Sequence, residues 1–234
     1  MQQNESQLFK SYACPLILFL LLTLLMLVID AGWGWDHPNA AWWQRAPEMV
    51  VYPLQTLVCG AFLWWTRRGI TWDWSWKSSA IGAAAGLLGI GFWLIPYLAG
   101  WVDASDGFDP ARIFGEGTLA YYAQYTLRFV RAVIIVAMAE EFFWRGYLMR
   151  WCVDADEPEK VSFGTPSWKG FALTTFAFML IHLPQDYAGA FVFGSIAYGL
   201  TVLTRRLSSV VLMHAVANLV MGVVAIACDL PGLW

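Results

Sequence analysis

The chain has 234 residues, of which 59% are hydrophobic and only 13% are charged. A soluble domain is about a quarter charged, so this composition excludes an ordinary soluble protein and indicates an integral membrane protein. The net charge of −3 and the absence of a basic stripe exclude nucleic acid as a partner.

Seven apolar segments predict an all-α fold, a polytopic transmembrane helical bundle of about seven spans, with eight as the alternative count. Several segments are shorter than the ~20 residues that a bilayer crossing usually needs, so tilt or local thinning must make up the difference. The first is interpreted as an uncleaved span, because no small-x-small cleavage site follows it. The segments are residues 15–29, 49–65, 80–98, 121–149, 168–183, 187–204 and 209–227.

Charges in the loops predict the orientation. Arg67, Arg68 and Lys77 follow the second span, whereas residues 100–117 carry four acidic residues against one arginine. Since lysine and arginine favour the cytoplasmic side, the amino terminus is expected to be cytoplasmic. The expected location is the inner (plasma) membrane of a bacterium.

Residues 1–234 are expected to form a single membrane domain. Residues 1–118 contain nondiagnostic spans, although the small residues at 82–91 predict a close approach of another helix. Residues 119–228 are expected to hold the functional core, with a polar cavity formed by the four C-terminal helices. The four cysteines are scattered, which disfavours a disulfide framework.

The fourth span is unusual because it contains five charged residues. Its longest uncharged run, residues 132–139, is too short to cross a bilayer in contact with lipid. We therefore expect neighbouring helices to shield this helix and its polar face to line a cavity. The charged residues are Arg128, Arg131, Glu140, Glu141 and Arg145.

Helical spacing predicts different roles for Glu140 and Glu141. Glu141 and Arg145 are four residues apart with the acid first, the favoured order for an ion pair. Glu140 is rotated by about 100° from Glu141 and has no cation at helical spacing. A second carboxylate beside it and a low dielectric favour its taking a proton from water near neutral pH, as a general base does. The alternative is that all three only hold helices together.

Two further pairs at the same spacing, each with a histidine, lie on later helices. Phe178 and His182 end the fifth segment, where a lone histidine is more often a hydrogen-bonded core residue than a catalyst. His214 and Asn218 share one face of the last segment. An imidazole and a carboxamide side by side can donate two hydrogen bonds to one oxyanion, and the alternative is a bond between helices.

Zinc remains an alternative, because two histidines and a glutamate form a catalytic zinc set. No H-E-x-x-H run is present, so no cofactor is the preferred prediction. No G-x-S-x-G elbow occurs and no cysteine neighbours a histidine in sequence, which disfavours serine and cysteine nucleophiles.

Three motifs in order resemble those of the CAAX protease and bacteriocin-processing (CPBP, or Abi) membrane proteins, which include the type II CAAX prenyl endopeptidases. They are Glu140-Glu141-x-x-x-Arg145, Phe178-x-x-x-His182 and His214-x-x-x-Asn218. The resemblance implies a glutamate-dependent intramembrane protease that acts on a membrane-associated protein or peptide.

The resemblance also implies a role for each motif residue. Glu140 and His182 would activate the water, and His214 with Asn218 would stabilise the oxyanion. Glu141, Arg145 and Phe178 would support the site.

Two other functions are compatible with the same residues, namely a non-catalytic accessory or immunity protein and a small transporter. One geometric conflict also remains at this stage. With the expected span ends, Glu140 lies far below the outer end of its helix, whereas His182 lies near the outer end of its own. A water shared by both requires tilt, a broken helix or different helix ends.

Overall fold

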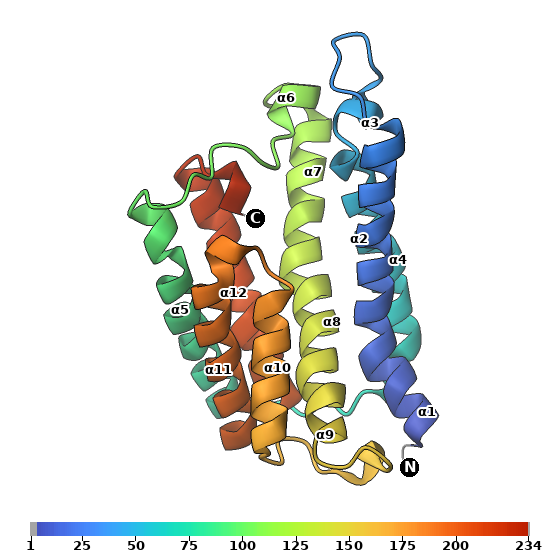
Figure 1. Ribbon diagram of the computed structural model, residues 1–234, viewed down its shortest axis with the longest axis vertical. Helices are drawn as coiled ribbons and strands as arrows, with labels where there is room; N and C mark the ends of the chain where they lie inside the picture. Colours follow the sequence, from blue (N-terminus) through green and yellow to red (C-terminus); the bar gives the residue numbers. More distant parts are fainter. Residues whose placement is uncertain (1–3, 234) are drawn as a thin grey trace.

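The computed structural model describes residues 4–233, and within this range every regular element is helical. The prediction of an all-α bundle is therefore confirmed. The helices run along one long axis, and most connections lie at the two ends of the bundle (Figure 1).

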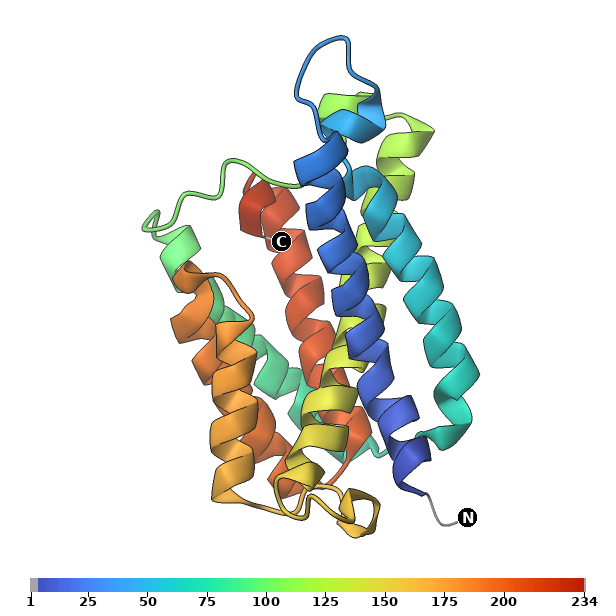
Figure 2. The same cartoon turned by 45° about the vertical axis from the view of Figure 1, so that its right-hand side comes forward.

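Two long helices near the amino terminus lie side by side. The short helix α1 (Glu5–Leu8) continues through a π-helical turn into α2 (Cys14–Trp33), and α4 (Glu48–Thr66) packs along α2. The single turn α3 (Trp42–Arg45) connects them at the end opposite the amino terminus (Figures 1 and 2). A third long helix, α5 (Trp76–Leu98), crosses to the other side of the bundle and packs against the C-terminal helices.

The most charged segment forms one continuous helical rod after the single turn α6 (Ala111–Phe114). It consists of α7 (Leu119–Phe129), a π-helical segment (Val130–Val136), α8 (Ala137–Glu141), a second π-helical segment (Phe142–Leu148) and α9 (Met149–Trp151). Figure 1 shows that this rod extends well beyond the upper end of α10. Wide π turns inside α-helices are frequent at functional sites, and here they lie on both sides of the adjacent glutamates.

Three helices complete the bundle. Helix α10 (Trp168–Leu180) packs on α11 (Tyr187–Thr204), and α12 (Leu207–Ala227) packs on α5 and α11. Short 3-10 turns at Pro184–Asp186 and Pro231–Leu233 precede α11 and follow α12.

All seven predicted spans fall on helices, and five of these helices are long and apolar enough to cross a membrane. The protein is thus an integral membrane protein by the character of these helices. The rod is too charged at its centre and α10, with 13 residues, is too short to qualify by itself. The number of crossings remains a prediction. The five helices are Glu5–Trp33, Glu48–Gly69, Trp76–Leu98, Pro184–Thr204 and Leu207–Ala227.

Aromatic and amide groups from α2 and α4 shield the upper charges of the rod. The buried Arg128 guanidinium lies 4.5 Å from the ring centroid of Tyr52. Arg131 donates from Nε to the Gln55 side-chain oxygen at 2.8 Å, and its guanidinium lies 4.8 Å from the Phe19 ring. Cation–π contact and a neutral acceptor therefore replace water around these arginines.

Glycines bring α5 into close contact with α12, as the small-residue run predicts. A Cβ atom at Gly82 would overlap the backbone carbonyl of Ser209, and one at Gly86 would overlap that of Met213. Only glycine permits this distance between the two helix backbones. The contact fixes α5 against the helix that carries His214.

Alanine substitution on α5 tests this contact. Gly86→Ala is expected to destabilise the protein by about 1–3 kcal/mol, since the new methyl group must push α12 away. The matched change Gly91→Ala lies on the same helix with no atom within 4 Å. It is expected to be neutral or to stabilise by up to about 1 kcal/mol. Thermal unfolding in detergent measures both, and equal unfolding midpoints would contradict the close contact.

Candidate active site

One cavity brings the four predicted catalytic side chains together. It has a volume of about 160 Å³, and Glu140, His182, His214 and Asn218 all line it. These residues come from α8, the turn after α10, and α12. Residues separated by up to 78 positions in the sequence therefore converge on one space.

Glu140 presents its carboxylate to this cavity without a fixed protein partner. The residue is only 8% exposed, and its Oε2 atom accepts no hydrogen bond from the described residues. A buried carboxylate oxygen normally has a donor. Glu140 therefore lines the cavity with one carboxylate oxygen that has no donor among the described residues.

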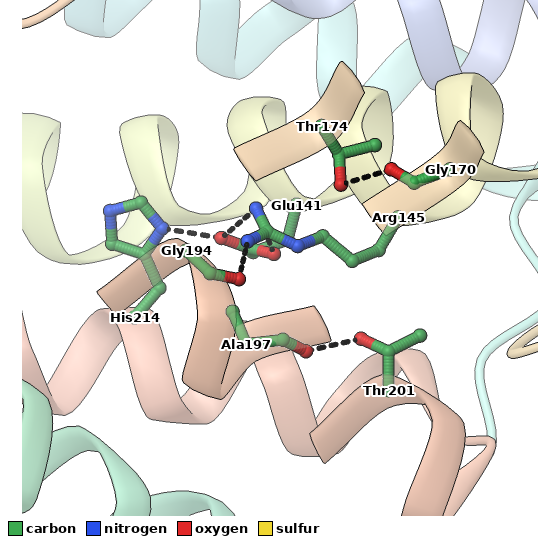
Figure 3. A network of polar contacts seen from close by, with 8 residues as sticks. All are labelled: Glu141, Arg145, Gly170, Thr174, Gly194, Ala197, Thr201 and His214. Atoms are coloured by element: carbon green, nitrogen blue, oxygen red, sulfur yellow. Dashed lines mark hydrogen bonds and ion pairs between the residues drawn. The ribbon is translucent and has the colours of Figure 1, made fainter. Parts of the chain in front are cut away.

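Glu141, one residue later, is in the opposite situation (Figure 3). Its carboxylate accepts a hydrogen bond from His214 Nδ1 at 2.7 Å and forms an ion pair with Arg145 at 3.1 Å. Arg145 also donates to the backbone carbonyl of Gly194 on α11 at 3.3 Å. Glu141 and Arg145 are both 0% exposed. This network connects the rod, α11 and α12.

The network determines how His214 faces the cavity. The Glu141 carboxylate holds Nδ1, which leaves the opposite edge of the ring, with Nε2, outside this contact, and His214 lines the cavity. Figure 3 shows Nε2 on the side of the ring away from Glu141. A carboxylate at one nitrogen of a histidine fixes both the tautomer and the ring orientation.

The position of His182 corrects the sequence-based helix end. The fifth segment was expected to be helical to residue 183, but α10 ends at Leu180, and His182 lies in the turn that follows. Since α10 is short, this turn reaches the level of α8 rather than the outer end of the rod (Figure 1). The apparent conflict in depth arose because both helices were expected to end at one outer level, whereas the rod extends well beyond the end of α10 (Figure 1).

His182 turns its ring back onto the end of α10. Its Nδ1 atom lies 2.7 Å from the carbonyl oxygen of Phe178. A carbonyl oxygen only accepts, so Nδ1 carries the proton and Nε2 has a free lone pair. The ring packs against the rings of Phe178 and Trp93, at centroid distances of 4.6 and 5.2 Å. Phe178 thus supports His182 with both its backbone and its side chain.

Asn218 lines the cavity one turn after His214. Its side-chain nitrogen donates to the carbonyl oxygen of Ala132, in the first π-helical segment of the rod, at 2.8 Å. The carboxamide nitrogen has two hydrogens, so one is used in this contact and the second remains for a ligand.

Sequence reasoning missed three residues that hold the His182 turn. Asp186 accepts hydrogen bonds from Trp93 Nε1 at 2.9 Å and from the Tyr97 hydroxyl at 2.6 Å. These contacts attach the turn before α11 to α5. An available signal was the spacing of four between His182 and Asp186, the same spacing as in the recognised pairs.

More elements contribute to the cavity wall than the sequence predicts. The four C-terminal helices were predicted to form it alone, but Ile90 and Trp93 of α5 and Leu233 of the C-terminal turn line it as well. The close contact of α5 with α12 explains this difference, because it places one face of α5 beside the C-terminal helices.

The lining residues include neither serine nor cysteine. Among residues 4–233, no group of three or more histidine, cysteine, aspartate or glutamate side chains is arranged to hold a metal ion. That the protein functions without zinc remains a prediction.

The comparison with protein families matches residues 122–220 to the family described as type II CAAX prenyl endopeptidase Rce1-like. This segment is less than half of the chain and contains all three motifs, so the match confirms the resemblance that the motifs indicate. The searches of curated proteins and of solved structures found no match.

The two glutamates are predicted to differ in their effect on stability. Glu141→Gln removes the charge that balances the buried Arg145, which is expected to destabilise the protein by about 3–5 kcal/mol. The matched control Glu140→Gln removes no protein contact to Oε2 and should unfold close to the wild-type temperature. Thermal unfolding in detergent compares them, and an equal loss in both variants would contradict these separate roles.

Proposed function

We propose that the protein is a membrane-embedded endopeptidase that hydrolyses a peptide bond with a water activated by Glu140 and His182. The observation that supports this most is the shared cavity, which Glu140, His182, His214 and Asn218 all line, with Glu140 Oε2 unpartnered among the described residues. The family match supports a protease in general terms. The substrate is expected to be a membrane-associated protein or peptide.

The proposed reaction starts at the carboxylate. Glu140 takes a proton from water, while His182 Nε2 accepts a second hydrogen bond and orients the oxygen. The water oxygen bonds to the carbonyl carbon and the carbonyl oxygen becomes an oxyanion. Glu140 then gives its proton to the departing amide nitrogen as the carbon–nitrogen bond breaks. Atoms and charge balance without a cofactor.

His214 and Asn218 are proposed to stabilise the oxyanion. Asn218 has one hydrogen left after its contact with Ala132. For His214 to donate from Nε2, its ring must carry both protons, and the Glu141 carboxylate at Nδ1 is the counter-ion for such a cation. Preorganised donors of this kind are often the largest contribution to catalysis.

Conservative exchange of the base is the first test of the proposal. Glu140→Gln is expected to lower the rate about 10²–10⁴-fold, because glutamine keeps the shape but cannot take the proton. His182→Ala should also lose most activity. Mass spectrometry of protein termini, in cells with wild-type protein or Glu140→Gln, identifies the substrate, and purified protein then gives the rates.

Two measurements complete this test. Detergent-solubilised Glu140→Gln must unfold like the wild type, so that lost activity is not lost structure. A repeat assay with a chelator tests the zinc-dependent alternative. Wild-type turnover by Glu140→Gln would reject the proposed mechanism and favour a non-catalytic accessory protein.

Removal of the Asn218 carboxamide tests the proposed oxyanion site separately from the base. Asn218→Ala is expected to reduce the rate about 10²–10³-fold, the usual effect of removing one such donor. Its effect should appear in kcat rather than in KM, because the donor acts on charge that exists only in the transition state. A change confined to KM would instead indicate that Asn218 only binds substrate.

A further inference from the structure

Two side chains hold the connection between α10 and α11 in the bundle. Ile181 and residues 183–185 are exposed, whereas His182 and Asp186 are half-buried. Both half-buried residues line the cavity. Because α10 ends at Leu180, the regular helix does not fix the direction of the His182 ring. The position of that ring therefore depends on side-chain contacts.

One tryptophan of α5 contacts both half-buried residues. The indole N–H of Trp93 donates to Asp186 Oδ1 at 2.9 Å, and the indole lies edge-on to the His182 ring at a centroid distance of 5.2 Å. Trp93 is buried and packs on Phe193 of α11. A Cβ atom at Gly189 would come within 2.8 Å of the indole, so the backbone of α11 also lies close to it. These contacts confine the indole between the aspartate, the histidine and α11.

A second donor on α5 completes the contact. Tyr97 lies one helical turn after Trp93, and its hydroxyl donates to the same Asp186 oxygen at 2.6 Å. Within residues 4–233, Asp186 forms no ion pair. A carboxylate that is partly removed from water needs hydrogen-bond donors, and here α5 supplies two neutral ones. Asp186 thus fixes the direction of the indole and attaches the start of α11 to α5.

From this arrangement we infer that Asp186 is a positioning residue for His182 and acts through the indole of Trp93. The inference rests on the proposed peptidase function, in which His182 Nε2 orients the attacking water. Asp186 holds the indole, and the rings of Trp93 and Phe178 together confine the imidazole. Displacement of an orienting group by about 1 Å can cost up to about 10²-fold in rate.

Removal of the Asp186 carboxylate tests this role in the reaction. Asp186→Ala is expected to lower kcat by about 10–10²-fold. KM should stay close to the wild-type value, because the loss concerns the orientation of the water and not the binding of substrate. Asp186→Asn keeps a side-chain oxygen that can accept both hydrogen bonds, so it should retain most of the rate. The rates are measured on the substrate that the altered protein termini identify.

The matched control lies at the other end of α10. The Tyr198 hydroxyl of α11 donates to the Ser167 carbonyl and accepts from the Ser167 backbone N–H, both at 2.8 Å. Tyr198→Phe therefore also removes two hydrogen bonds beside α10, but none near His182. It should lower the unfolding temperature about as much as Asp186→Ala and leave kcat unchanged. Equal losses of kcat in the two variants would overturn the inference, because general destabilisation would then explain both.

The position of the His182 ring can also be measured without an activity assay. The chain has three histidines, so NMR of histidine-labelled protein in detergent is simple to assign, and the His182 signal is the one that His182→Ala removes. The rings of Phe178 and Trp93 should shift its ring protons away from the values of an exposed histidine. Asp186→Ala should reduce this shift, whereas Tyr198→Phe should keep it. An unchanged His182 signal in Asp186→Ala would overturn the inference.

A milder variant covers the case in which Asp186→Ala does not fold. Tyr97→Phe removes one of the two donors to the Asp186 oxygen and keeps the aromatic ring. It is expected to lower kcat less than Asp186→Ala and to move the His182 signal in the same direction. A folded Tyr97→Phe protein with wild-type kcat and a wild-type His182 signal would then reject the positioning role.

The failure of the inference differs from failure of the proposed function. Absence of Glu140-dependent hydrolysis by the wild type in detergent would reject the peptidase, while the NMR comparison would still decide whether Asp186 positions the ring. An active wild type with full kcat in Asp186→Ala would reject the positioning role and keep the peptidase. A change confined to KM would also reject it, because Asp186 would then contact substrate instead.

Discussion

The buried contact between Glu141, Arg145 and His214 is the interaction on which the rest of the site depends. Two opposite charges cannot remain unpaired at membrane depth, so the glutamate and the arginine must meet. The position of the third group follows from that pair, because the same carboxylate holds His214 Nδ1. The hydrogen bond between Glu141 and His214 thus holds the rod against α12 beside the cavity.

The charged rod remains within the bundle because its different faces meet different neighbours. Its upper arginines meet the aromatic rings and the Gln55 amide of α2 and α4. Its lower ion pair meets α11 and α12. Glu140 and Val136 line the cavity. The N-terminal helices are therefore required physically, even though their sequences contain no motif, since without them the arginines would contact lipid.

The sequence predicted the elements and the main site residues well, but not the details set by three-dimensional packing. Spacing by four identified His214 and Asn218, because it marks one helix face in any environment, and Glu140 was identified by its rotation away from the Glu141–Arg145 pair. The end of α10 was missed because Ile181 and Leu183 continue the apolar run, with Pro184 as the one breaker nearby. The wall from α5 was also missed, since the small residues at 82–91 predict a close contact with another helix but not that this helix is α12.

Glu140 and Glu141 belong to one motif and are chemically identical, yet they have different surroundings. The rotation of about 100° between Glu140 and Glu141 directs one carboxylate to a cavity and the other to a guanidinium. The two side chains are identical, so only their surroundings distinguish the role of Glu140 from that of Glu141. The carboxylate of Glu141 is fixed by His214 and Arg145, whereas Oε2 of Glu140 has no donor among the described residues.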